Sequence, residues 1–174
     1  MLAAECAWAI LRAEHARTRE LLARLDTAMK TGDGTRTGQR AASAIEVIER
    51  LQDFEETTHR PKGVVMLNML RGRSSEADEL LDELDSESEC CNGLLSQAKT
   101  TLKRAETGDA RAAAEAEALL QRHRQFMNLH LDKEDTLLHS QTALLLTAEE
   151  WAAVVSSISK EVRTAKERAR RRSH

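Results

Sequence analysis

The chain is poor in aromatic residues, proline and glycine. It contains no Tyr, two Trp, two Phe, one Pro and seven Gly among 174 residues. Ala, Leu, Glu and Arg dominate instead, and these residues favour helix over sheet. The composition therefore predicts an all-α protein.

Long apolar runs and a disulfide framework are also missing. No apolar run approaches the length of a membrane span, and the opening MLAAECAWAILR lacks the basic start and cleavage site of a signal peptide. Three cysteines form an odd set without scaffold spacing, which favours a reducing cytoplasm. The formal charge of −3 is spread over both signs. We therefore expect a cytoplasmic protein with no nucleic-acid or membrane partner.

Apolar residues recur at steps of three and four along four long segments, as on amphipathic helices. The first runs from about Leu2 to Lys30 and ends in a loop at 31–38. The second runs from about Arg40, and Pro61 is expected to bend or break it. Ser74 or Ser75 is placed to cap the third, and Asp109 the fourth. The predicted buried stripe of the fourth is Ala116, Leu120, His123, Met127, His130, Glu134 and Leu137.

A shorter fifth helix is predicted after these four. Thr147 and Glu150 have the spacing of a capping box, and the apolar pattern fails beyond Arg163. Four long helices with short connections pack antiparallel. We predict an up-down-up-down four-helix bundle with a short C-terminal helix as one domain over residues 1–163. Residues 164–174, which end in KERARRRSH, are expected to be a disordered basic tail.

Polar residues interrupt the predicted apolar stripes of all four long helices. They are His15, His59, Ser88 and His130, with Glu134 one turn beyond His130. Burying an ionisable group without a partner costs several kcal/mol, so the intrusion needs a reason. For any single histidine, a hydrogen-bonded core residue is the simpler explanation. His130 and Glu134 are four apart, so on a helix both can reach one ion. The joint placement of these polar residues on several buried stripes favours metal ligation.

Several segments resemble the hemerythrin-like, or HHE cation-binding, domain. They are AEHARTRELLARLD, FEETTHRPKG, FMNLHLDKEDTLL and LTAEEW. The resemblance implies a four-helix bundle holding a non-haem di-iron centre with histidines from all four helices and two bridging carboxylates. It also implies roles in oxygen carriage, iron or oxygen sensing, or stress resistance. By position, the ligands it implies are His15, His59, His130 and Glu134.

Two positions depart from the family pattern. Gly63 stands where a carboxylate is expected, and Ser88 stands at or next to the expected third-helix histidine. Losing a bridging anion disfavours a metal pair, so we expect one non-haem iron rather than two. Two histidines and one carboxylate are a familiar ligand set for mononuclear Fe(II). Glu55 and Cys91 are possible substitutes. A thiolate would favour zinc, although Cys91 is also explained as a small core residue.

Three functions are compatible with these residues. The first is a metal-binding module or sensor for O2, NO or iron. The second is a degenerate, metal-free bundle with a structural or partner-binding role. The third is an enzyme, which we rank last because no general base, nucleophile or substrate pocket is identifiable. The expected partners are a metal ion and a diatomic gas, and no protein partner is indicated.

Overall fold

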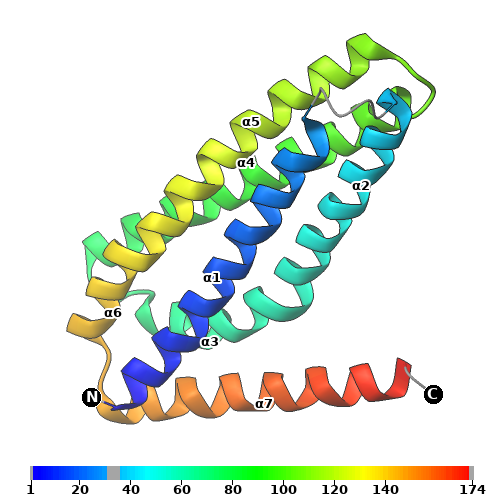
Figure 1. The fold of residues 1–174 in the computed structure, drawn as a ribbon. Helices are drawn as coiled ribbons and strands as arrows, with labels where there is room; N and C mark the ends of the chain where they lie inside the picture. The colour runs from blue at the N-terminus through cyan, green and yellow to red at the C-terminus, as the bar shows by residue number, and fades with distance from the viewer. Residues whose placement is uncertain (1, 31–35, 173–174) are drawn as a thin grey trace. The chain divides into compact units, whose positions relative to one another are not determined.

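The computed structural model describes residues 2–30 and 36–172, and nearly all of them are helical (Figure 1). The elements are α1 (Leu2–Met29), α2 (Thr37–Phe54), η1 (Glu55–His59), α3 (Arg60–Leu70), α4 (Ser75–Ala105), α5 (Ala110–Lys133), η2 (Glu134–Leu138), α6 (His139–Leu145) and α7 (Ala148–Arg172). The elements η1 and η2 are single π-helical turns. No strand occurs in the ranges described, so the all-α prediction is confirmed. The predicted loop falls largely on residues 31–35, which lie outside those ranges. None of the described helices has both the length and the apolar character that crossing a membrane requires.

The predicted caps open the later helices. Ser74 and Asp109 each accept a hydrogen bond from the backbone N–H three residues on, at 3.1 and 3.0 Å. At the start of α7, the Thr147 hydroxyl accepts from the Glu150 backbone at 3.2 Å, and the Glu150 carboxylate accepts from the Thr147 backbone at 2.9 Å. Each cap satisfies N–H groups that have no partner within the helix. The sequence signals at these helix starts are therefore confirmed.

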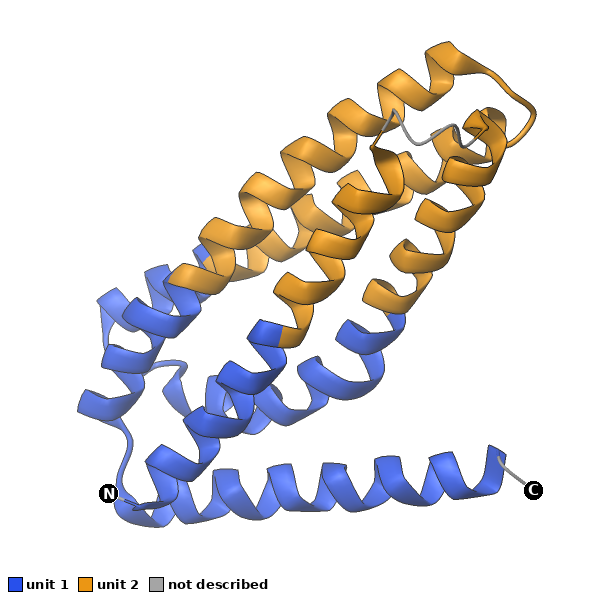
Figure 2. Cartoon of the chain, in the orientation of Figure 1, with its two compact units in different colours: residues 1–16, 53–83, 133–174 blue, residues 17–52, 84–132 orange. Residues whose placement is uncertain are grey.

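The chain divides into two compact units (Figure 2). Unit 1 comprises residues 1–16, 53–83 and 133–174, and unit 2 comprises residues 17–52 and 84–132. In unit 1, α7 packs along α3 and also contacts η1, while α3 contacts α6. Trp151, Val154 and Ile158 of α7 are completely buried. Each unit is assembled from separate stretches of the sequence.

Ion pairs indicate the helix directions within unit 2. On α1 and α5, Arg19 pairs with Asp132 at 2.9 Å, and Asp26 pairs with Arg124 at 3.0 Å. The residue numbers rise on one helix as they fall on the other, so these helices run in opposite directions. The corresponding pairs between α4 and α5 are Glu87 with His130 and Arg104 with Glu115.

Pro61 does not break the helix; a break was one of the two outcomes expected of it, the other being a bend. Arg60 keeps helical dihedral angles, with φ −54° and ψ −46°. Pro61 lies in the first turn of α3, directly after the π-helical turn η1. Proline is tolerated in the first turn because its missing N–H is not needed there. The chain therefore stays helical from α2 through η1 into α3.

The predicted buried stripe of the fourth long segment is wrong at its end. Leu137 is 53% exposed, whereas Leu138 is only 2% exposed. Both lie in η2. A π-helical turn holds one residue more than an α-helical turn, so it moves the buried face on by one position. The regular three-four spacing used for the prediction does not include that extra residue.

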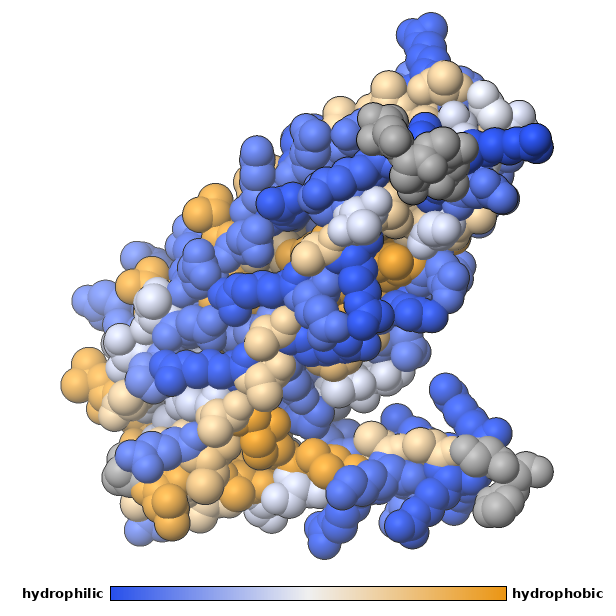
Figure 3. Space-filling model, viewed as in Figure 1, coloured by the Kyte–Doolittle hydropathy of each residue, from blue (hydrophilic) through white to orange (hydrophobic). Residues whose placement is uncertain are grey.

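Of residues 164–174, which were predicted to be a disordered tail after a short fifth helix, residues 164–172 belong to the 25-residue helix α7, and residues 173–174 lie outside the described ranges. Helix α7 continues to Arg172, beyond the point at which the apolar pattern fails. Ala, Lys, Glu and Arg are good helix formers, and basic side chains in the last turn are favourable at the negative end of the helix dipole. Apolar side chains gather along the N-terminal half of α7, and hydrophilic side chains predominate along its C-terminal half (Figure 3).

Candidate metal centre

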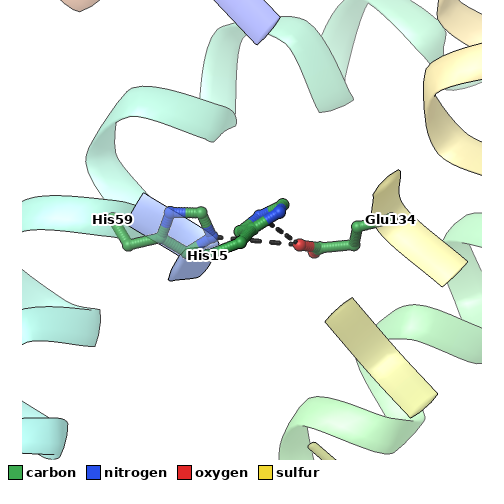
Figure 4. A group of neighbouring side chains, drawn as sticks. All are labelled: His15, His59 and Glu134. Atoms are coloured by element: carbon green, nitrogen blue, oxygen red, sulfur yellow. Dashed lines mark ion pairs between the residues drawn. The ribbon is translucent and has the colours of Figure 1, made fainter. Parts of the chain in front are cut away.

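Three side chains of unit 1 converge on one point (Figure 4). They are His15 of α1, His59 at the end of η1, and Glu134 at the start of η2. Each offers one donor atom, and these atoms all lie within 4.8 Å of one another. Nε2 of His15 is 2.8 Å from Oε2 of Glu134, and Nε2 of His59 is 3.9 Å from the same oxygen. In the part of the chain that the structure describes, this is the one group of three or more such residues that could hold an ion.

The local helix geometry brings these residues to the shared point. His15 lies on the buried stripe of α1 and is 2% exposed. His59 and Glu134 each sit at one end of a π-helical turn. Such turns occur frequently at functional sites. The His15 and His59 rings meet edge to face, with centroids 4.9 Å apart and an interplanar angle of 71°.

Each histidine ring is held by a carboxylate at its other nitrogen. Nδ1 of His15 lies 2.6 Å from Oδ1 of Asp135, and Nδ1 of His59 lies 2.9 Å from Oε2 of Glu14. A carboxylate oxygen accepts, so each Nδ1–H donates and each Nε2 is directed toward Glu134. In metal sites, such outer partners orient the ring and make the ligating nitrogen more basic.

The charges around these three side chains favour a cation. Burial raises the pKa of Glu14, but hydrogen bonds from His59 and Lys62 outweigh it and leave this pKa below its usual value. Burial lowers the pKa of His59, but hydrogen bonds to Glu134 and Glu14 raise it overall to about 10. Without a metal, the His59 ring is therefore positively charged at neutral pH. The surrounding carboxylates stabilise positive charge at the point where the donors meet.

Both separations to Glu134 fit a single transition-metal ion, while the imidazole nitrogens lie within 4.8 Å of each other. Ligands at about 2.1 Å from an ion lie no more than about 4.2 Å apart when they are opposite each other. The two distances to Glu134, 2.8 and 3.9 Å, fall within that limit. Imidazole and carboxylate ligands suit iron and zinc, and three protein ligands leave positions open to small molecules.

The other residues singled out from the sequence are not among the three converging donors. His130 belongs to unit 2, where its Nδ1 is 3.0 Å from Oε2 of Glu87. Cys91 and Ser88 also belong to unit 2. Cys91 is completely buried, as a small core residue would be. Glu55 lies on η1 with its carboxylate 3.8 Å from Arg60 and is not one of the three converging residues.

Three further residues support this site, although their sequence context did not predict a role for them: Glu14, Lys62 and Asp135. Lys62 is 6% exposed and forms an ion pair with Glu14. It lies on a buried stripe with Met66 and Leu70, so a lysine at that spacing was a detectable signal. Glu14 and Asp135 directly adjoin His15 and Glu134 in the sequence. Helical periodicity gives no reason to place them beside the same centre.

Fold and site together define an all-helical protein with a candidate cation site. The hemerythrin HHE cation-binding domain matches residues 6–141, a range that includes His15, His59, His130 and Glu134. This range is well over half of the chain, so the chain belongs to that family. No curated protein matches the chain, and no solved structure matches it.

Proposed function

We propose that this chain binds one iron ion through Nε2 of His15, Nε2 of His59 and a carboxylate oxygen of Glu134. The observation that carries the proposal is the convergence of these atoms on one point, with both rings oriented by carboxylates at Nδ1. Two imidazoles and one carboxylate are a common ligand set for mononuclear Fe(II), and zinc is the main competitor. His130 stays a predicted additional ligand, and the up-down-up-down four-helix bundle stays the predicted arrangement.

The role that we propose is binding or sensing of O2 or NO. Bound iron would supply open coordination positions for such a gas. The protein's own contribution is to keep the rings in place and to limit access of water. His15 is 2% exposed, while His59 and Glu134 have side chains 14% and 15% exposed. A buried site of this kind admits a small gas more readily than a larger substrate.

Metal content tests the first part of the proposal. Protein without an affinity tag would be depleted of metal, reloaded with Fe(II) without oxygen, desalted and analysed for iron. We expect about one iron per chain in the wild type and a large loss in His15→Ala and Glu134→Gln. His139→Gln is the matched control, because His139 is a half-buried histidine of unit 1 outside the group of three. A wild-type iron content near zero would reject the proposal.

Gas binding is tested separately on the loaded protein. Addition of NO without oxygen should change the absorbance spectrum of the iron-loaded wild type and leave the metal-depleted protein unchanged. An unchanged spectrum in the loaded protein would reject gas binding but leave metal binding intact.

A metal-free bundle is the second candidate function. It is favoured by one observation, which is that the polar groups of the site already have partners within the protein. His15 contacts Glu134 and Asp135, and His59 contacts Glu14. A network with its hydrogen bonds satisfied can stand in a core without an ion. In that case neither iron nor zinc would change the thermal stability.

A further inference from the structure

Lys62 is a buried charge next to the candidate metal centre. It is 6% exposed, and its ammonium forms an ion pair with Oε1 of Glu14, which is itself 8% exposed. The other oxygen of Glu14 lies 2.9 Å from Nδ1 of His59. Lys62, Glu14 and His59 thus form a continuous chain of contacts within unit 1. Burying an ammonium costs several kcal/mol before pairing, so an apolar residue would be the simpler choice on this stripe.

The charge balance around the site suggests what Lys62 does. Four charged side chains of this cluster are less than a quarter exposed, namely Glu14, Lys62, Glu134 and Asp135. When both imidazoles bind an ion they are neutral, so the three carboxylates and one ammonium leave two negative charges, which one divalent ion neutralises. A second divalent ion would leave two uncompensated positive charges in a largely buried site, which is strongly unfavourable. Glu55 is more exposed, at 34%, and its carboxylate lies near Arg60.

The carboxylate oxygens near the site also disfavour a second ion. Oε1 of Glu14 is occupied by Lys62, and Oε2 is occupied by His59. Gly63, one turn beyond His59, has no side chain to offer. Glu14 is a carboxylate next to the site, but both of its oxygens have partners, one of them the ammonium of Lys62, so it is not open to a further ion.

We propose that Lys62 acts as a fixed cation that limits the site of His15, His59 and Glu134 to one metal ion. It takes the Glu14 oxygen and supplies the positive charge that a second ion would otherwise provide. This inference rests on the proposed function, since it concerns how many ions the same site holds. It makes Lys62 a specificity-determining residue for metal stoichiometry, without being a ligand.

The test counts ions in protein that differs at Lys62. Metal-depleted wild type and Lys62→Gln would be titrated with Fe(II) without oxygen, by calorimetry and by iron analysis after desalting. We expect one ion per chain in the wild type and two in Lys62→Gln. Lys62→Arg keeps the charge and should bind one. Lys133→Gln removes a lysine that pairs with Glu83 at 2.6 Å in unit 1, and it should also bind one.

Two further variants test the same prediction if Lys62→Gln does not fold or lacks a ligand for the second ion. Lys62→Ala leaves space for water to solvate Glu14, so it serves if the Gln variant does not fold. Lys62→Gln combined with Gly63→Glu adds a carboxylate, and a Cβ at position 63 would meet only Leu67 Cδ1, at 3.9 Å. Both should bind two ions. Helical content measured by circular dichroism identifies the variants that fold.

The outcomes separate the two proposals. One ion in the wild type and one in every folded Lys62 variant would overturn the role of Lys62 and leave metal binding intact. Two ions in the wild type would overturn both the role of Lys62 and the proposed stoichiometry of one iron, and would leave metal binding itself intact. No ion in the wild type would overturn the proposed function, and the role of Lys62 with it.

Discussion

Nε2 of His15 and Oε2 of Glu134 lie 2.8 Å apart, although α1 and η2 are at opposite ends of the family match. Both side chains belong to unit 1, and each is also adjacent in sequence to a charged residue of the same network. Glu14 precedes His15 and contacts His59, while Asp135 follows Glu134 and contacts His15. The support for each ring therefore comes from an element other than its own.

Metal binding should stabilise the fold. An ion that binds only the folded chain adds about 2.7 kcal/mol at a hundred times its Kd. For a chain of this size that corresponds to a rise in Tm of roughly 5 to 10 °C. Thermal unfolding followed by circular dichroism, with Fe(II) or with chelator, measures this shift. His15→Ala should abolish it. An equal shift in wild type and variant would mean that the ion binds elsewhere.

The carboxylates that hold the rings should affect metal affinity without being ligands. Asp135→Asn and Glu14→Gln weaken the orientation of His15 and His59, and removal of such partners lowers metal affinity by about 10- to 100-fold. Calorimetric titration of metal-depleted protein gives the Kd. Asp132→Asn is the control, since Asp132 pairs with Arg19 in unit 2. Unchanged affinity in both variants would show that the rings are held by packing alone.

Replacing His123 should stabilise the protein. His123 is completely buried, and neither ring nitrogen has a hydrogen-bond partner among the described residues. An unsatisfied buried polar group costs roughly 1 to 3 kcal/mol, so His123→Leu should raise the free energy of unfolding by about that amount. Denaturant unfolding at pH 7 measures it. A destabilised variant would indicate that a water molecule or another group satisfies the ring in solution.

The same residue should make stability depend on pH. Burial lowers the pKa of His123 to about 4, from 6.5 in the unfolded chain. The unfolded chain therefore binds the proton first, and stability is full above pH 6.5 and falls as the pH drops toward 4. The slope from this group is at most about 1.4 kcal/mol per pH unit. The difference in unfolding free energy between His123→Leu and wild type should widen over that window. A constant difference would contradict the assigned pKa.

Much of the fold follows from local sequence signals. Helix starts are set by side chains within one turn, so Ser74, Asp109 and the pair Thr147 and Glu150 could be identified from spacing alone. His15, His59 and Glu134 were identified because polar residues interrupted apolar stripes and matched a family pattern. Their convergence depends on tertiary packing, which spacing does not supply.

The features that were missed depend on irregular helix geometry or on contacts between elements. A π-helical turn has no sequence signature as definite as a cap, so η1 and η2 could not be predicted. The ion pair of Lys62 with Glu14 joins α3 to α1, and nothing local to either residue specifies it. The helical end of α7 reflects intrinsic propensity without burial, whereas the apolar pattern reports burial alone.

The register shift at η2 gives a prediction with its own matched control. Leu138 is 2% exposed and Leu137 is 53% exposed, although they are neighbours of the same type. Leu138→Ala should lower the free energy of unfolding by about 2 to 5 kcal/mol, because it removes buried methyl groups and leaves a cavity. Leu137→Ala should change it by no more than about 0.5 kcal/mol, as a surface substitution does. Denaturant unfolding of the two variants side by side decides the matter. The reverse order would mean that this segment is a regular α-helix in solution, with Leu137 on the buried face.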